Sequence, residues 1–181
     1  MNEYKGSLDA SGKRFAIVAG RFNETFTQKL VDGAIDCLSR LGAGEEDVEL
    51  FWVPGSFEVP QATMSAARSG RYDAVISLGT VIRGATAHFE LVAGEAARGI
   101  AAVSRETGIP AVFGIVSADT MEQAAERCGG KMGNRGWDAA EAAVEMANLG
   151  EAFEGRQAGE ELIRETEKGK KGDGAEEITR S

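Results

Sequence analysis

Short apolar runs alternate along this chain with longer segments in which apolar residues recur every three or four positions. The runs predict strands, and the longer period predicts amphipathic helices. Strands are expected at residues 15–18, 48–53, 73–78 and 111–116. Helices are expected at residues 23–41, 88–106, 120–128 and 135–149. A further helix is expected after a turn that begins at Pro54, with Phe57 and Glu58 in its first turn.

This order of elements predicts an α/β fold of three layers, αβα. Apolar strands joined by helices pair in a mainly parallel sheet of four strands, with helices on both faces. Ligands of such sheets bind at the carboxyl ends of the strands. The segments expected to meet there are residues 20–23, residues 54–58, residues 79–88 and the stretch after residue 116.

The chain changes character near its carboxyl end. Residues 156–181 contain no aromatic residue and mix charges of both signs. Such a segment buries too little apolar surface to offset its ordering entropy. We therefore expect one domain at residues 1–155 and a mobile tail, with a helical stretch at residues 159–168. A docking segment is the alternative.

Charge and composition exclude several classes of protein. The net charge of −9 repels phosphate backbones and anionic lipid, so neither nucleic acid nor a membrane is expected as a partner. No apolar stretch approaches the roughly 20 residues that span a bilayer, and the start lacks the apolar centre of a signal peptide. These features predict a cytoplasmic protein. Cys37 and Cys128 have no metal-binding spacing and are expected to be buried apolar residues.

The segment GTVIRGATAH, residues 79–88, is the densest in candidate chemistry. Its small residues 84–86 form a turn that enters a helix, where backbone N–H groups and the Thr86 hydroxyl could bind an anion. An ordinary capped turn is the alternative. His88, the one histidine of the chain, stands at the helix start, where the positive end of the dipole favours a neutral imidazole that can accept a proton. A purely structural histidine is the competing interpretation.

Other candidates lie at the remaining strand ends. Phe22 follows the first strand and could stack on a planar heterocycle or pack in the core. Glu58 could recognise ligand hydroxyls or only assist a helix start. Arg127, Lys131 and Arg135 recur every four residues and could bind a small anion or form a solvated helical face, although the glycines between them indicate a bent connection.

Five motifs together resemble one enzyme family. They are GRFN at 20–23, VPGSFEVP at 53–60, LGTVIRGATAHFE at 78–90, FGIV at 113–116 and ERCGGKMGNRG at 126–136. Over residues 10–150 the chain is similar to the 6,7-dimethyl-8-ribityllumazine synthases. The resemblance implies a flavodoxin-like fold and an enzyme, a transferase of riboflavin biosynthesis.

The reaction implied by the resemblance condenses 5-amino-6-(D-ribitylamino)uracil with 3,4-dihydroxy-2-butanone 4-phosphate and releases phosphate and water. It implies no organic cofactor and no metal. Carried over by matching motif, the roles are a catalytic proton carrier, His88, and a catalytic and phosphate-binding arginine, Arg127. Ala85 and Thr86 would hold the phosphate with Arg127. The expected substrate-binding residues are Phe22, Asn23, Ser56, Phe57, Glu58, Thr80, Val81, Ile82, Phe113 and Arg135.

The family relationship also implies a homo-oligomer. Its sites lie between two neighbouring subunits, so Phe113, Arg127 and Arg135 are expected from the adjacent chain. Members form pentamers or hollow shells of twelve pentamers, and the short GGKMGNRG connection favours the 60-subunit shell. Residues 4–8 would add a strand to a neighbour's sheet, and riboflavin synthase is a further possible partner. A lumazine- or flavin-binding protein without turnover and a purely structural cage are the alternatives.

Overall fold

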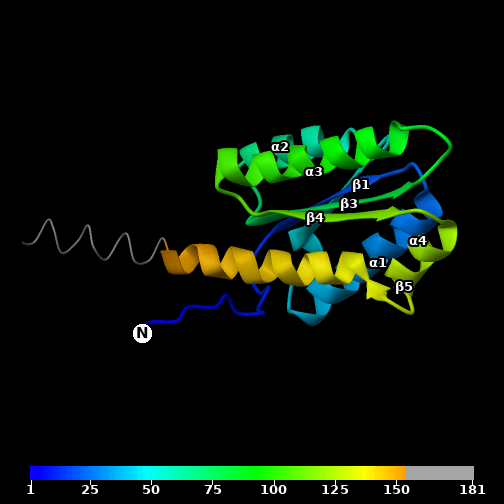
Figure 1. The fold of residues 1–181 in the computed structure, drawn as a ribbon. Helices are drawn as coiled ribbons and strands as arrows, with labels where there is room; N and C mark the ends of the chain where they lie inside the picture. Colours follow the sequence, from blue (N-terminus) through cyan, green and yellow to red (C-terminus); the bar gives the residue numbers. More distant parts are fainter. Residues whose placement is uncertain (154–181) are drawn as a thin grey trace, which may run out of the picture.

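The computed structural model describes residues 1–153, whose centre is a parallel four-stranded sheet (Figure 1). Its strands follow the order β2-β1-β3-β4. Their bounds are Phe15–Gly20 for β1, Val48–Val53 for β2, Ala74–Ile82 for β3 and Ala111–Ala118 for β4. All three pairings are parallel, so the strands end at one common edge, as the alternation of elements predicts.

Helices cover both faces of this sheet. Figure 1 shows α2 (Val59–Arg68) and α3 (His88–Thr107) on one face, and α1 (Glu24–Arg40), α4 (Met121–Arg127) and the last helix, which occupies residues 135–153, on the other. The Thr120 side chain caps α4 by accepting a hydrogen bond from the Gln123 N–H at 3.2 Å. The expected three-layer, flavodoxin-like α/β fold is confirmed.

The core lies on both sides of β1, whose six residues are all buried. Phe15, Ile17 and Ala19 pack on the α1 side, and Ala16 and Val18 pack on the α2 and α3 side. A strand buried on both faces has an unbroken apolar sequence, which explains why this run is conspicuous in the sequence.

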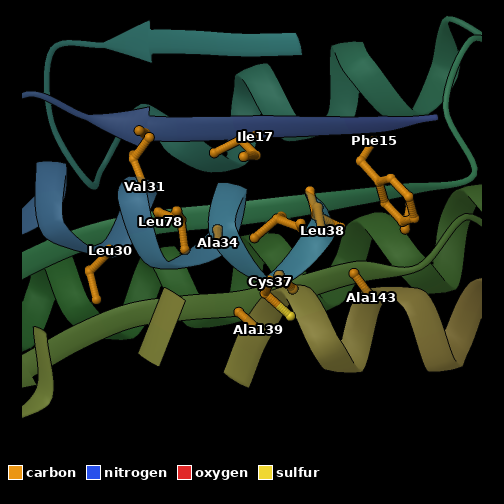
Figure 2. Packing of buried hydrophobic residues seen from close by; sticks show 14 of the residues in the cluster. Phe15, Ile17, Leu30, Val31, Ala34, Cys37, Leu38, Leu78, Ala139 and Ala143 are labelled. Carbon is orange, nitrogen blue, oxygen red and sulfur yellow. The ribbon is translucent and has the colours of Figure 1, made fainter. Parts of the chain in front are cut away.

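Figure 2 shows the larger of the two clusters, to which β1, β3, α1 and the last helix all contribute. Gly136 lets the last helix approach α1 closely, because a Cβ at this position would overlap the backbone of Leu30. Cys37 and Cys128 are buried in this cluster, as expected, and burial raises the pKa of the Cys37 thiol to about 11.

Several boundaries differ from the sequence prediction. β3 continues through Ile82, four residues beyond the predicted end, because the Gly79–Ile82 segment pairs with β4. Phe57 and Glu58 were expected in the first turn of a helix, but they lie in the turn before α2, which begins at Val59.

Two short elements were not predicted at all. A 3-10 helix, Glu45–Asp47, precedes β2. The glycines after α4 form a small antiparallel hairpin, β5 (Cys128–Gly130) with β6 (Gly133–Asn134). This hairpin interrupts the helix and confirms the bent connection between Arg127 and Arg135.

The two ends of the chain differ in how far the structure describes them. The predicted tail at residues 156–181, with its helical stretch at 159–168, lies outside the described residues. Residues 4–8 form no helix or strand in the single chain, and Asn148 on the last helix donates hydrogen bonds to the carbonyls of Ser7 and Asp9 at 2.8 and 2.9 Å. No helix within residues 1–153 has both the length and the apolar content to cross a bilayer.

Candidate active site

The carboxyl ends of β1 and β2 place Phe22 at the surface. The N–H groups of Arg21 and Phe22 donate to the carbonyls of Val53 and Pro54, at 2.8 and 3.1 Å, which continues the pairing of the two strands into their loops. The Phe22 side chain is 73% exposed, so it does not pack in the core. An exposed ring on a loop fixed at both sides can stack on a flat ligand.

Asn23 ties the same loop to β3. Its Nδ2 donates to the Thr80 carbonyl at 2.9 Å, and the buried Thr27 and Thr80 hydroxyls lie 3.4 Å apart beneath it. Asn23 holds a left-handed backbone conformation with φ of 62°, which asparagine tolerates better than most residues. Its amide nitrogen is therefore committed to the protein, and its position fixes Phe22 relative to Thr80.

The turn after β2 packs against the middle of β3. Ser56 is buried, and a Cβ at Gly79 would lie only 2.5 Å from the Ser56 Oγ. Glycine at position 79 thus lets the turn approach the strand. Glu58 makes no side-chain hydrogen bond that caps α2, so the structure gives no support to a capping role.

Phe22 and Glu58 lie close together across Gly55. A Cβ built at Gly55 would meet the Glu58 Oε2 at 3.3 Å and the Phe22 Cβ at 3.7 Å. An exposed aromatic ring and a carboxylate that can accept hydrogen bonds are thereby joined at one edge of the sheet. Phe57, in the same turn, is 57% exposed.

One residue, Arg83, joins the end of β3 to the anion turn, the name used here for residues 84–86. Val81 is buried and Ile82 is half-buried, whereas Ala85, Thr86 and His88 are exposed. His88 is the first residue of α3, and its N–H lies 3.4 Å from the Thr86 Oγ1, which accepts from it. The Thr86 hydroxyl keeps its own hydrogen to donate, so the turn can offer an O–H and the positive end of a 20-residue helix to an anion.

A separate groove of about 440 Å³ runs between β4 and the last helix. Phe113, Arg127 and Arg135 line it, in company with Asp138. Arg127 donates to the Gln123 carbonyl at 2.9 Å and Arg135 pairs with Asp138 at 2.8 Å. Two guanidinium groups beside an aromatic ring are suited to a planar or anionic ligand.

The candidate residues therefore form two groups. The strand-end cluster lies at the carboxyl ends of β1, β2 and β3 and contains Phe22, Asn23, Ser56, Phe57, Glu58, Thr80, Val81, Ile82, Ala85, Thr86 and His88. The β4 groove holds Phe113, Arg127 and Arg135, and none of the strand-end cluster lines it. Since β4 is an edge strand of the sheet, this groove is open to a neighbouring molecule.

The structure adds one residue that the sequence analysis missed. Asp138 lines the β4 groove and holds Arg135 in place. The spacing of three residues between an arginine and an aspartate in a helix was the available signal. Within residues 1–153, no group of three or more His, Cys, Asp or Glu side chains is arranged to hold a metal ion.

Comparison with known proteins agrees with the motifs. The family model described as 6,7-dimethyl-8-ribityllumazine synthase matches residues 12–151. Two curated relatives with that name, both from Clostridium kluyveri, are each 52% identical over 149 residues, which is 82% of this chain and 97% of theirs. The chain belongs to the 6,7-dimethyl-8-ribityllumazine synthase family.

The lumazine synthase match includes both groups of candidate residues, since the strand-end cluster and the β4 groove fall inside residues 12–151. Lumazine synthases are transferases of riboflavin biosynthesis. The expected family and enzyme class are thus confirmed.

Proposed function

We propose that this chain catalyses the condensation of 5-amino-6-(D-ribitylamino)uracil with 3,4-dihydroxy-2-butanone 4-phosphate, in a site composed of the strand-end cluster of one subunit and the β4 groove of its neighbour. The observation that carries this proposal is the division of the candidate residues between two surfaces. Each surface holds part of what the reaction needs, and the edge strand β4 forms one wall of the groove.

The pyrimidine substrate would bind to the strand-end cluster. Phe22 stacks on its ring, and the backbone of Val81 and Ile82 meets its polar edge. The ribityl chain extends along the turn of Ser56 and Phe57 to Glu58, whose carboxylate accepts from its hydroxyls. The exposure of Phe22 and its proximity to Glu58 across Gly55 support this placement.

The phosphate of the second substrate would bind between the anion turn and the neighbour's Arg127. The backbone and hydroxyl donors of Ala85 and Thr86 satisfy phosphate oxygens from one side, and a guanidinium satisfies them from the other. Phe113 and Arg135 of the neighbour would close the pyrimidine side. Their position in one groove with Arg127 supports this division of labour.

Catalysis then rests chiefly on positioning. An amine of the pyrimidine substrate attacks the ketone, so no protein nucleophile is required. Holding both reactants together can supply several kcal/mol. His88 moves protons during imine formation, phosphate elimination and ring closure, which is worth roughly 10²- to 10⁴-fold.

The assembly belongs to the same proposal. We expect a homo-oligomer built from pentamers, of which twelve form a 60-subunit shell, because the connection between α4 and the last helix is a short hairpin without an insertion. Sedimentation velocity should show a particle of that size, and a pentamer alone would contradict the shell. Cytoplasmic location and riboflavin synthase as a partner stay predictions, which fractionation and co-sedimentation would test.

The direct test mixes both substrates with the purified protein and follows lumazine absorbance and fluorescence. Growth of the product signal in proportion to protein concentration is expected. A protein that binds lumazine tightly but produces none would instead be a binding protein that has kept the pocket without turnover.

A further inference from the structure

Arg83 is the first residue after β3 and directly precedes the anion turn. The turn has little packing of its own, since residues 84–88 are exposed and no atom lies within 4 Å of the Cβ position of Gly84. A loop without packing must be held at its ends to present donors in a fixed geometry. The helix α3 holds the turn at one end, and the contacts of Arg83 hold it at the end next to β3.

The Arg83 guanidinium contacts three side chains from two other segments. Its Nε donates to Asp119 Oδ1 at 2.6 Å, in the turn after β4, and its Nη1 donates to Glu90 in the first turn of α3. The Cζ lies 4.3 Å from the centre of the Phe89 ring. The Arg83 N–H also donates to the Ala118 carbonyl at 2.9 Å, so backbone and side chain hold the same neighbour.

These contacts also set the charge around the turn. Glu90 lies two residues after His88 and four after Thr86, and the Arg83 guanidinium lowers the pKa of the Glu90 carboxyl. Without Arg83, two ionised carboxylates would stand near a turn that has to accept a phosphate monoester. Negative charges beside the anion turn oppose the binding of a negatively charged phosphate.

We propose that Arg83 is a positioning residue for phosphate recognition, which holds the anion turn through Asp119 and Glu90 and offsets the negative charge of these two carboxylates. The inference rests on the proposed function, because it takes the ligand of the turn to be the phosphate of the butanone substrate. We assign Arg83 a positioning role because its Nε and Nη1 already donate to the carboxylates of Asp119 and Glu90.

Steady-state kinetics of Arg83→Gln test this role. We expect the KM of the butanone phosphate to rise about tenfold while the KM of the pyrimidine changes less than about twofold, because the substitution frees two negative charges beside the anion turn alone. Raising the salt concentration toward 1 M, where the Debye length is about 3 Å, should reduce the difference from the wild type. Equal rises in both KM values, or no rise in either, would overturn the proposal.

Second substitutions separate the effect from general damage. Arg83→Gln combined with Glu90→Gln should recover part of the lost phosphate affinity, because one uncompensated charge is removed. Arg83→Lys should give an intermediate KM, since an ammonium keeps the charge but cannot hold two carboxylates in a fixed fork. A double variant worse than Arg83→Gln would count against the charge argument.

The matched control is Arg98, which pairs with Glu95. Both residues lie on α3, further along the chain from the anion turn than Glu90. Arg98→Gln should leave both KM values near those of the wild type. Binding of inorganic phosphate, measured by calorimetry, gives a readout without turnover. If the wild type forms no lumazine, the proposed function fails. If the wild type forms lumazine and Arg83→Gln binds phosphate as tightly as the wild type, only the role of Arg83 is refuted.

Discussion

The hydrogen bond between Asn23, which is half-buried, and Thr80, which is buried, shows how polar residues below the surface place an exposed one. Thr80 is 1% exposed and its carbonyl accepts from Asn23, whereas the adjacent Phe22 projects into solvent. A buried polar group left without a partner costs about 1–3 kcal/mol, so this hydrogen bond holds the loop firmly. In this loop the side chain proposed to stack on the substrate is exposed, and the two residues that position it are half-buried and buried.

Replacement of Asn23 tests this dependence. Asn23→Gly keeps the left-handed backbone accessible but removes the hydrogen bond to Thr80, so the KM of the pyrimidine should rise several-fold, in line with about 0.5–1.5 kcal/mol for one hydrogen bond. Asn23→Ala adds backbone strain and should lower Tm further. Kinetics with each substrate varied in turn measure the effect, and a rise confined to the butanone phosphate would contradict it.

His88 and Arg127 should differ in their importance. If positioning supplies more of the rate than proton transfer, His88→Ala lowers kcat by about 10²- to 10⁴-fold and leaves measurable activity. Arg127→Gln should raise the KM of the butanone phosphate and lower kcat. The guanidinium is expected to bind the phosphate group of the substrate and to stabilise it when it leaves. Complete loss of activity in His88→Ala would reverse the ranking.

At the scale of elements, the contact between α1 and the last helix depends on small residues. A Cβ at Gly136 would overlap the backbone carbonyl of Leu30 on α1, whereas nothing lies within 4 Å of the Cβ position at Gly150 on the same helix. Gly136→Ala should destabilise the protein by about 1–3 kcal/mol or more through overpacking. Gly150→Ala, the matched control, should be neutral or stabilising by up to about 1 kcal/mol. Urea unfolding of both variants measures the difference.

The sequence predicts those elements best whose pattern matches their burial. β1 was located within two residues because its apolar run is uninterrupted and all six of its residues are buried. β2 was located as well, although Glu49 interrupts its apolar run and its residues are half-buried or exposed. The end of β3 was missed because Gly79 and Thr80 are typical of loops, and pairing with Ile115 and Val116, more than thirty residues away, makes them a strand. The β5–β6 hairpin likewise depends on contacts that no local pattern reveals.

The sequence predicts candidate residues for the site, but it does not predict how they are arranged. His88 and the anion turn stand at a predicted strand end, and their exposure there agrees with that reading. By contrast, Phe113 lies within β4 rather than at its end, and only the packing of β4 against the last helix creates the groove that it shares with Arg127. Tertiary packing of this kind has no signature in the spacing of residues.

At the scale of the whole molecule, one chain holds the strand-end cluster and the β4 groove without joining them. Hence the proposed enzyme requires contact between copies. A neighbour on the β4 edge would also cover Phe113, which is 45% exposed in the single chain. Activity should therefore fall on dilution below the concentration at which the copies dissociate.

Mixing of impaired variants gives the sharpest test of a shared site. Suppose that one chain carries Glu58→Gln with His88→Ala, and the other carries Arg127→Gln. Co-expressed copies that assemble at random place an intact strand-end cluster opposite an intact β4 groove in about one quarter of the sites, so activity should return to about that fraction of the wild type. If each site formed within one chain, every site would carry a substitution and no activity would return. Separately purified variants, mixed without exchange of subunits, provide the control.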